Sequence, residues 1–185
     1  SIGASKLVGN NQAEIARTQA HAAENLFNLG KTEEAHATVK EAYSRVEDLP
    51  AEDRDRLNIE SILADIEGSL GSPEVARVRL KRILASQRQL FGNESNDTQS
   101  TIDRLTSHDI DTAHFEEARP LLEEVLASRI KKYGAENTKT YSATNGLAII
   151  ALEQKRFADA ERLLAPQLPI AERVWLRQST PRGTW

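Results

Sequence analysis

A string that recurs after 42 residues constrains this chain more than any other feature. Residues 83–92 read ILASQRQLFG, and residues 125–134 read VLASRIKKYG. In both, an aliphatic residue precedes Leu-Ala-Ser, and an aromatic residue followed by glycine ends the string. A fixed period of about 20–50 residues is typical of solenoids, in which each repeat stacks on its neighbours.

Single positions keep the same period along most of the chain. Alanines recur at intervals of 41 or 42 residues, at Ala35, Ala76, Ala118 and Ala160. An aliphatic residue follows each alanine by four positions, and a small residue precedes each by twelve: Ala23, Ala64, Thr106 and Ala148. Because only small side chains let two helix axes approach to about 8–9 Å, we expect the four recurring alanines to be buried at helix crossings.

Each repeat predicts a pair of helices, since its apolar residues are spaced by three and four. The first helices of the pairs are expected over 12–29, 53–70, 97–111 and 138–154. The second helices are expected over 32–47, 73–91, 115–133 and 157–176. Gly30 and Gly71 suit the left-handed conformation that ends many helices, and Ala113 and Lys155 take the same place in the later repeats, where we expect strain.

The segment YGAENTKTYSATNGLA (133–148) carries a family resemblance, with Asn145 and the Leu147–Ala148 pair at matching positions. With the small residues twelve apart and glycine at the turn, it resembles the tetratricopeptide repeat, in the 42-residue variant of kinesin light chains. The resemblance implies an all-α, right-handed α-solenoid of about four helix-turn-helix pairs over 12–176. Its units would span about 12–50, 53–92, 97–134 and 138–176.

The resemblance also has consequences for the ends of the chain. Residues 1–11 are expected to be an N-terminal tail or the remnant of a preceding helix, and residues 177–185 a tail from a truncated next repeat. It further implies a fragment of a larger, bacterial-type regulatory protein, such as a kinase or a transcription regulator. The chain departs from the family pattern at Glu67 and Asp109, where a large apolar residue is usual.

No stretch of the sequence indicates catalysis or a cofactor. HDIDTAH (108–114) has two histidines six residues apart, which would point to different sides of a helix, so we interpret it as a solvated turn and predict no metal site. The chain has no cysteine and none of the common nucleotide, zinc-protease or hydrolase motifs. We predict a protein that is not an enzyme and needs no cofactor.

Charge and hydropathy narrow the classes of partner. The net charge is −4 and no basic stripe is present, which argues against nucleic acid. No apolar run approaches the roughly 18 residues of a membrane helix. We expect a cytoplasmic protein without a membrane partner, and a periplasmic location stays open.

The resemblance implies that the first helices line a concave face that binds a protein or peptide. The positions on that face are Arg17, Ala20, Glu24, Phe27, Asn58, Ser61, Asp65, Ser100, Asp103, Arg104, Ser107, Ser142, Asn145, Ile149 and Glu153. Their acidic residues outnumber the basic ones by two, which favours a basic peptide. The alternative is a structural module that forms a homodimer through Leu168, Val174 and Trp175 at its C-terminal end.

Overall fold

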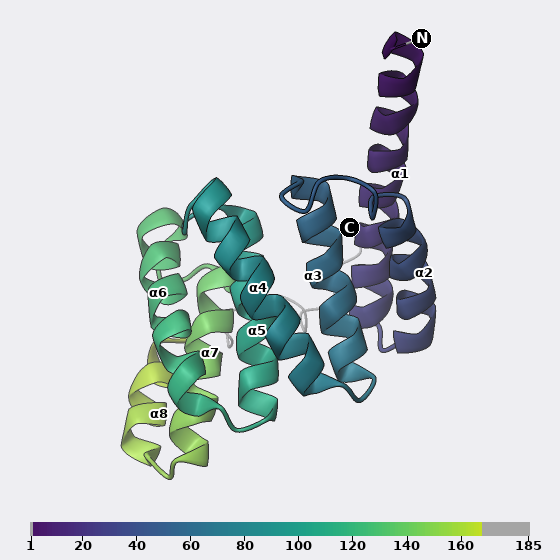
Figure 1. The fold of residues 1–185 in the computed structure, drawn as a ribbon. Coiled ribbons are helices and arrows are strands. Elements are labelled where there is room, and N and C mark those ends of the chain that lie inside the picture. Colours follow the sequence, from purple (N-terminus) through teal and green to yellow (C-terminus); the bar gives the residue numbers. More distant parts are fainter. Residues whose placement is uncertain (1, 168–185) are drawn as a thin grey trace, which may run out of the picture. The chain divides into compact units, whose positions relative to one another are not determined.

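The computed structural model of this protein describes residues 2–167, with side chains from residue 11 onward, and this part contains helices and no strand (Figure 1). The α-helices are α1 (Ile2–Asn28), α2 (Thr32–Ser44), α3 (Arg54–Ser69), α4 (Pro73–Phe91), α5 (Asn96–Asp111), α6 (Phe115–Tyr133), α7 (Thr138–Glu153) and α8 (Phe157–Leu164). A short 3₁₀ helix follows over Ala165–Gln167. The predicted all-α fold of helix pairs is confirmed.

Side chains and glycines at the connections between pairs fix where helices begin and end. Asp53, Ser95 and Asn137 precede α3, α5 and α7, and each side chain accepts hydrogen bonds from backbone N–H groups of the first turn. Such caps satisfy donors that have no partner inside the helix. Gly92 and Gly134 end α4 and α6 with φ of 79° and 85°, as the repeated string predicts.

The turn inside each pair requires a left-handed residue. In the first two pairs this residue is Gly30 or Gly71, with φ of 76° and 115°. Ala113 and Lys155 hold the same place in the later pairs with φ of 61° and 59°, and they are the non-glycine residues with positive φ in the described chain. The strain that the sequence predicts at these two turns is therefore present.

Two predicted helix ends differ from the structure. The helix α1 begins at Ile2 instead of residue 12, so residues 2–11, expected as a tail or the remnant of another helix, continue α1. This segment contains no proline, and each of its two glycines, Gly3 and Gly9, weakens a helix by about 1 kcal/mol without ending it. At the other end α8 stops at Leu164, and the 3₁₀ helix that follows contains Pro166. The rest of the predicted helix, 168–176, lies outside the described residues.

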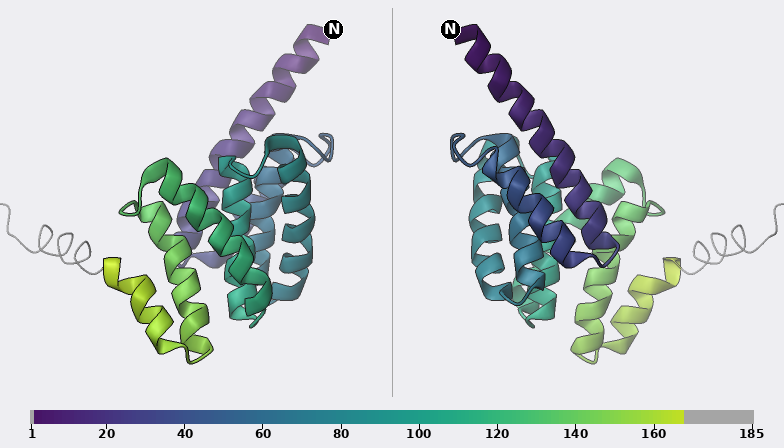
Figure 2. Two further views of the ribbon diagram at one scale, coloured as in Figure 1. Left: turned by 90° about the vertical axis from the view of Figure 1, so that its left-hand side faces the viewer. Right: turned by 90° about the vertical axis from the view of Figure 1, so that its right-hand side faces the viewer.

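The chain forms two compact units, and the boundary between them along the sequence falls in the turn between α5 and α6, at residues 112 and 113. In unit 1, α3 is central and packs against α1, α2, α4 and α5. Figure 2 shows α1 as one continuous helix whose N-terminal turns project beyond α2 and α3. In unit 2, α7 packs against α6 on one side and α8 on the other.

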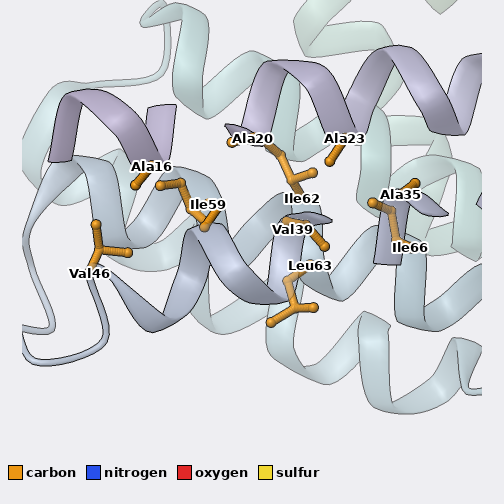
Figure 3. Packing of buried hydrophobic residues seen from close by; sticks show 11 residues of the cluster. Ala16, Ala20, Ala23, Ala35, Val39, Val46, Ile59, Ile62, Leu63 and Ile66 are labelled. Atoms are coloured by element: carbon orange, nitrogen blue, oxygen red, sulfur yellow. The ribbon is translucent and has the colours of Figure 1, made fainter. Parts of the chain in front are cut away.

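The recurring alanines are buried, as the sequence predicts. The exposed fraction is at most 2% for Ala35, Ala76, Ala118 and Ala160. In unit 1 a core cluster joins α1, α2 and α3 (Figure 3), where Ala16, Ala20 and Ala23 of α1 leave room for larger side chains such as Val39 and Ile62. Alanines on α1 and α2 thus allow these two helices to approach closely, and α3 packs against both of them.

Candidate binding faces of the first helices

In unit 1, an ion-pair ladder joins α1, α3 and α5, each of which is the first helix of its pair. Arg104 of α5 donates through its Nη2 to Oε1 of Glu24 on α1, and its Nε lies 3.6 Å from Oδ2 of Asp65 on α3. All three residues were predicted to lie on the binding face, and the structure brings them together. The Arg104 side chain is only 13% exposed, so this cation is held largely inside the ladder.

His108 extends this ladder, although the sequence analysis placed it in a solvated turn. That interpretation is wrong, because His108 lies in the last turn of α5 and is 3% exposed. Its Nε2 lies 3.1 Å from Oδ1 of Asp65. The close contact with this carboxylate raises the pKa of His108 against the opposing effect of burial.

Gly68 makes the space that the His108 ring occupies. A Cβ atom at Gly68 would lie 2.8 Å from Nε2 of His108 and 2.7 Å from the Cβ of Ala76. Both distances are shorter than real side chains tolerate, so only glycine fits between α4 and α5 here. Because Arg104 and His108 are four residues apart on one helix, their spacing was the signal that could have placed His108 beside the predicted face.

Asp109 is also buried, with 0% of its surface exposed, and the solvated-turn interpretation is wrong for it too. Its Oδ1 accepts a hydrogen bond of 2.5 Å from Nε of Arg77 on α4. Arg77 also donates to Glu74 at 2.9 Å. A buried ion pair between α4 and α5 therefore stands where the resemblance led us to expect a large apolar residue, and each charge needs the other to stay buried.

The remaining predicted residues of unit 1 differ in what their side chains can reach. Arg17 is exposed and pairs with Asp55 at 2.6 Å, a carboxylate that the sequence analysis did not place on this face. Asn58 accepts a hydrogen bond of 2.9 Å from Gln87. Ser61 is 2% exposed and donates to the carbonyl of Asn58, so the prediction that its side chain lines a surface is wrong.

The other residues of unit 1 that were predicted to lie on the binding face differ in how far they are exposed to solvent. Ala20 is buried, and Phe27 packs against the core cluster while remaining partly exposed. Asp103 is half-buried, and Ser100 and Ser107 are exposed.

In unit 2 the predicted residues form an exposed strip along α7. Ser142, Asn145, Ile149 and Glu153 are spaced by three or four residues and are all exposed. Ile149 is 44% exposed although neighbours such as Ile150 are buried. An exposed aliphatic side chain beside an exposed amide offers both apolar contact and backbone hydrogen bonds to a bound chain.

The predicted self-association residues Leu168, Val174 and Trp175 lie outside the described residues. Among residues 2–167, no helix has the length and apolar composition needed to cross a membrane. Within the same range, no three His, Asp or Glu side chains are grouped so that they could hold a metal ion.

Comparison with known proteins shows what these helix pairs are similar to. The tetratricopeptide repeat family matches residues 110–138. No curated protein is similar enough in sequence to count as a match. Solved structures do match: the nearly identical TPR-like repeats of a putative kinesin light chain from Podosopora anserina align with a TM-score of 0.73 at 21% identity, over 88% of this chain and 77% of that one. A variant of the same protein aligns with a TM-score of 0.72 at 21% identity, over 88% and 76%.

A second protein has the same fold. BtubC (BKLC) from P. vanneervenii aligns with a TM-score of 0.66 at 19% identity, over 97% of this chain and 74% of that one. At these identities the likeness establishes the fold. Tetratricopeptide repeats generally serve as protein-interaction scaffolds. The chain therefore contains a segment that matches the tetratricopeptide repeat family and shares, along most of its length, the fold of kinesin-light-chain TPR-like repeats.

Proposed function

We propose that this chain is a noncatalytic scaffold that binds an extended basic peptide on the exposed sides of its first helices. The observation that carries the proposal is the exposed strip of α7, where Asn145, Ile149 and Glu153 stand together on one side of the helix. Asn145 would hydrogen-bond the peptide backbone, Ile149 would pack against an aliphatic side chain, and Glu153 would pair with a lysine or arginine.

The charges of unit 1 support the preference for a basic ligand. On the predicted binding face of unit 1, the carboxylates of Glu24, Asp65 and Asp103 outnumber the guanidiniums of Arg17 and Arg104, and Asp55 beside this face pairs with Arg17. The excess of negative charge disfavours an acidic peptide, because like charges across an interface lower affinity. A place inside a larger signalling or regulatory protein of the cytoplasm belongs to this proposal and is supported by the family resemblance alone.

A titration with two probe peptides tests the proposal. The first probe alternates lysine and leucine, and the second replaces each lysine with glutamate. We expect the lysine probe to bind and the glutamate probe to fail. The double variant Asn145→Ala with Glu153→Gln should weaken binding about tenfold or more, because it removes a hydrogen-bonding amide and a charge.

Gln89→Ala is the matched control, since it removes an exposed amide from α4, which is a second helix and lies outside the proposed surface. It should leave the affinity unchanged. Equal binding of both probes, or an unchanged affinity in the double variant, would show that the first-helix sides are not the binding surface.

A further inference from the structure

Unit 2 has a hollow on the side of α7 that faces away from the exposed strip. The hollow has a volume of about 330 Å³ and is lined by three arginines, two acidic residues and three apolar residues from α6, α7, α8 and the turn before α8. Leu147 and Ala151 of α7 form part of its lining. Leu147 is two residues beyond Asn145, which is a rotation of about 200° around the helix, so the two surfaces lie on opposite sides. We call this feature the arginine hollow.

Positive charge exceeds negative charge in the arginine hollow, although the whole chain carries a net charge of −4. The lining of the arginine hollow contains three guanidiniums, those of Arg119, Arg156 and Arg162, and two carboxylates, those of Glu123 and Asp159. Two of the arginines share one carboxylate: Nη2 of Arg156 lies 2.5 Å from Oδ2 of Asp159, and Arg162 contacts the other oxygen. The hydrogen bond from Arg156, together with the charges of both arginines, lowers the pKa of Asp159.

Arg119 is the arginine with the weakest charge compensation in this lining. Its Nη2 donates to the neutral amide oxygen of Gln154 at 2.6 Å. Its ion pair is with Glu116 at 3.7 Å, and that side chain is 82% exposed, so water screens the pair strongly. A guanidinium carries five N–H donors, and one amide oxygen leaves most of them for a ligand.

The rest of the lining suits a ligand that also has an apolar part. Leu147 and Ala151 are largely buried at the wall provided by α7, and Leu163 of α8 is half-buried. Arginine pairs well with carboxylates because its planar donors match the two carboxylate oxygens. Aliphatic side chains next to such a carboxylate would find apolar contact on α7 and α8.

We propose that the arginine hollow binds a glutamate or aspartate side chain of an acidic peptide, with Arg119 and Arg162 donating to the carboxylate from α6 and α8. A neighbouring aliphatic residue of that peptide packs on Leu147 and Leu163. This site is independent of the basic-peptide surface, since it lies on the opposite side of α7 and prefers the opposite charge.

Isothermal titration with a blocked tetrapeptide, Leu-Glu-Glu-Leu, and its glutamine counterpart tests this site. The glutamate peptide should bind about tenfold more tightly than the glutamine peptide, because only a carboxylate gains charge-assisted bonds from arginine. Arg119→Gln should remove most of that difference. Glu123→Gln should tighten binding of the glutamate peptide, because it removes an exposed carboxylate from the lining.

Two controls separate the arginine hollow from general electrostatics and from the proposed function. Lys40→Gln changes the net charge as much as Arg119→Gln does, but it lies exposed on α2 in unit 1 and should have no effect. Asn145→Ala with Glu153→Gln should also leave the tetrapeptide affinity unchanged. Equal affinity for the two tetrapeptides, or an equal loss in Arg119→Gln and Lys40→Gln, would overturn the proposal.

Discussion

Asp65 holds two cationic side chains that come from successive turns of α5. Arg104 and His108 both approach its carboxylate, one to each oxygen. The sequence indicated the Arg104 position, because the repeat pattern places it on the exposed side of a first helix. It could not indicate how deeply His108 is buried, because that depth depends on Gly68, which is 40 residues away and on another helix.

The raised pKa of His108 makes the stability of unit 1 depend on pH. A folded-state pKa above the ordinary value of 6.5 means that the folded protein binds the proton more tightly than the unfolded chain does. The contribution is fully present below about pH 6.5 and is lost as the pH rises through the folded-state pKa. We therefore expect the free energy of unfolding, measured by urea titration, to fall as the pH rises above about 6.5.

The comparison with His108→Gln isolates this effect from other titrating groups. The carboxylates that raise the pKa of His108 are those of Asp65 on α3 and Asp111 on α5, Arg104 contacts the same Asp65, and all three are the same in both proteins. Glutamine is uncharged throughout this range, so the variant should lose less stability than the wild type as pH rises. Parallel pH profiles for the two proteins would show that His108 does not link protonation to folding.

At the scale of elements, a helix bound could be predicted where a glycine or a turn residue marks it in the sequence. The bounds of α4 and α6 agree with the prediction, because Gly92 and Gly134 end these helices and the turn residues before them set their starts. The start of α1 was predicted ten residues too late, since nothing local marks it. Side-chain burial was harder to predict, as Ser61 and Asp109 show, because it depends on partners from other helices.

Lys155 offers a test of the turn between α7 and α8. Its φ of 59° costs a residue with a Cβ atom roughly 1 kcal/mol, and glycine avoids this cost. Lys155→Gly should therefore raise the melting temperature, corresponding to a gain of about 0.5–1 kcal/mol. The same substitution at Lys40, which is exposed within α2, should lower it by about 1 kcal/mol, because glycine weakens a helix interior. A destabilised Lys155→Gly variant would contradict a strained turn.

At the scale of the whole molecule, contacts connect mainly neighbouring helices within each compact unit. Solenoids of this kind have a stability that is roughly a sum of repeat terms and nearest-neighbour terms. Local damage in one unit can therefore raise local unfolding there without an equal effect elsewhere. Gly68 is well placed for such damage, because it lies at the contact of α3 with Ala76 of α4 and His108 of α5.

Gly68→Ala should destabilise unit 1 and leave unit 2 protected. The added Cβ would be too close to both Ala76 and His108, and relieving the overlap should cost about 1–3 kcal/mol, partly offset by about 1 kcal/mol of better helix propensity. Hydrogen–deuterium exchange should then quicken over 54–111 and stay unchanged over 138–164. Ser69→Ala, at an exposed neighbouring position, should change neither segment. Two outcomes would contradict this prediction. Equally faster exchange in both segments would mean that the two units unfold as one cooperative block. Unchanged exchange in both segments would mean that the space around Gly68 adapts to a methyl group.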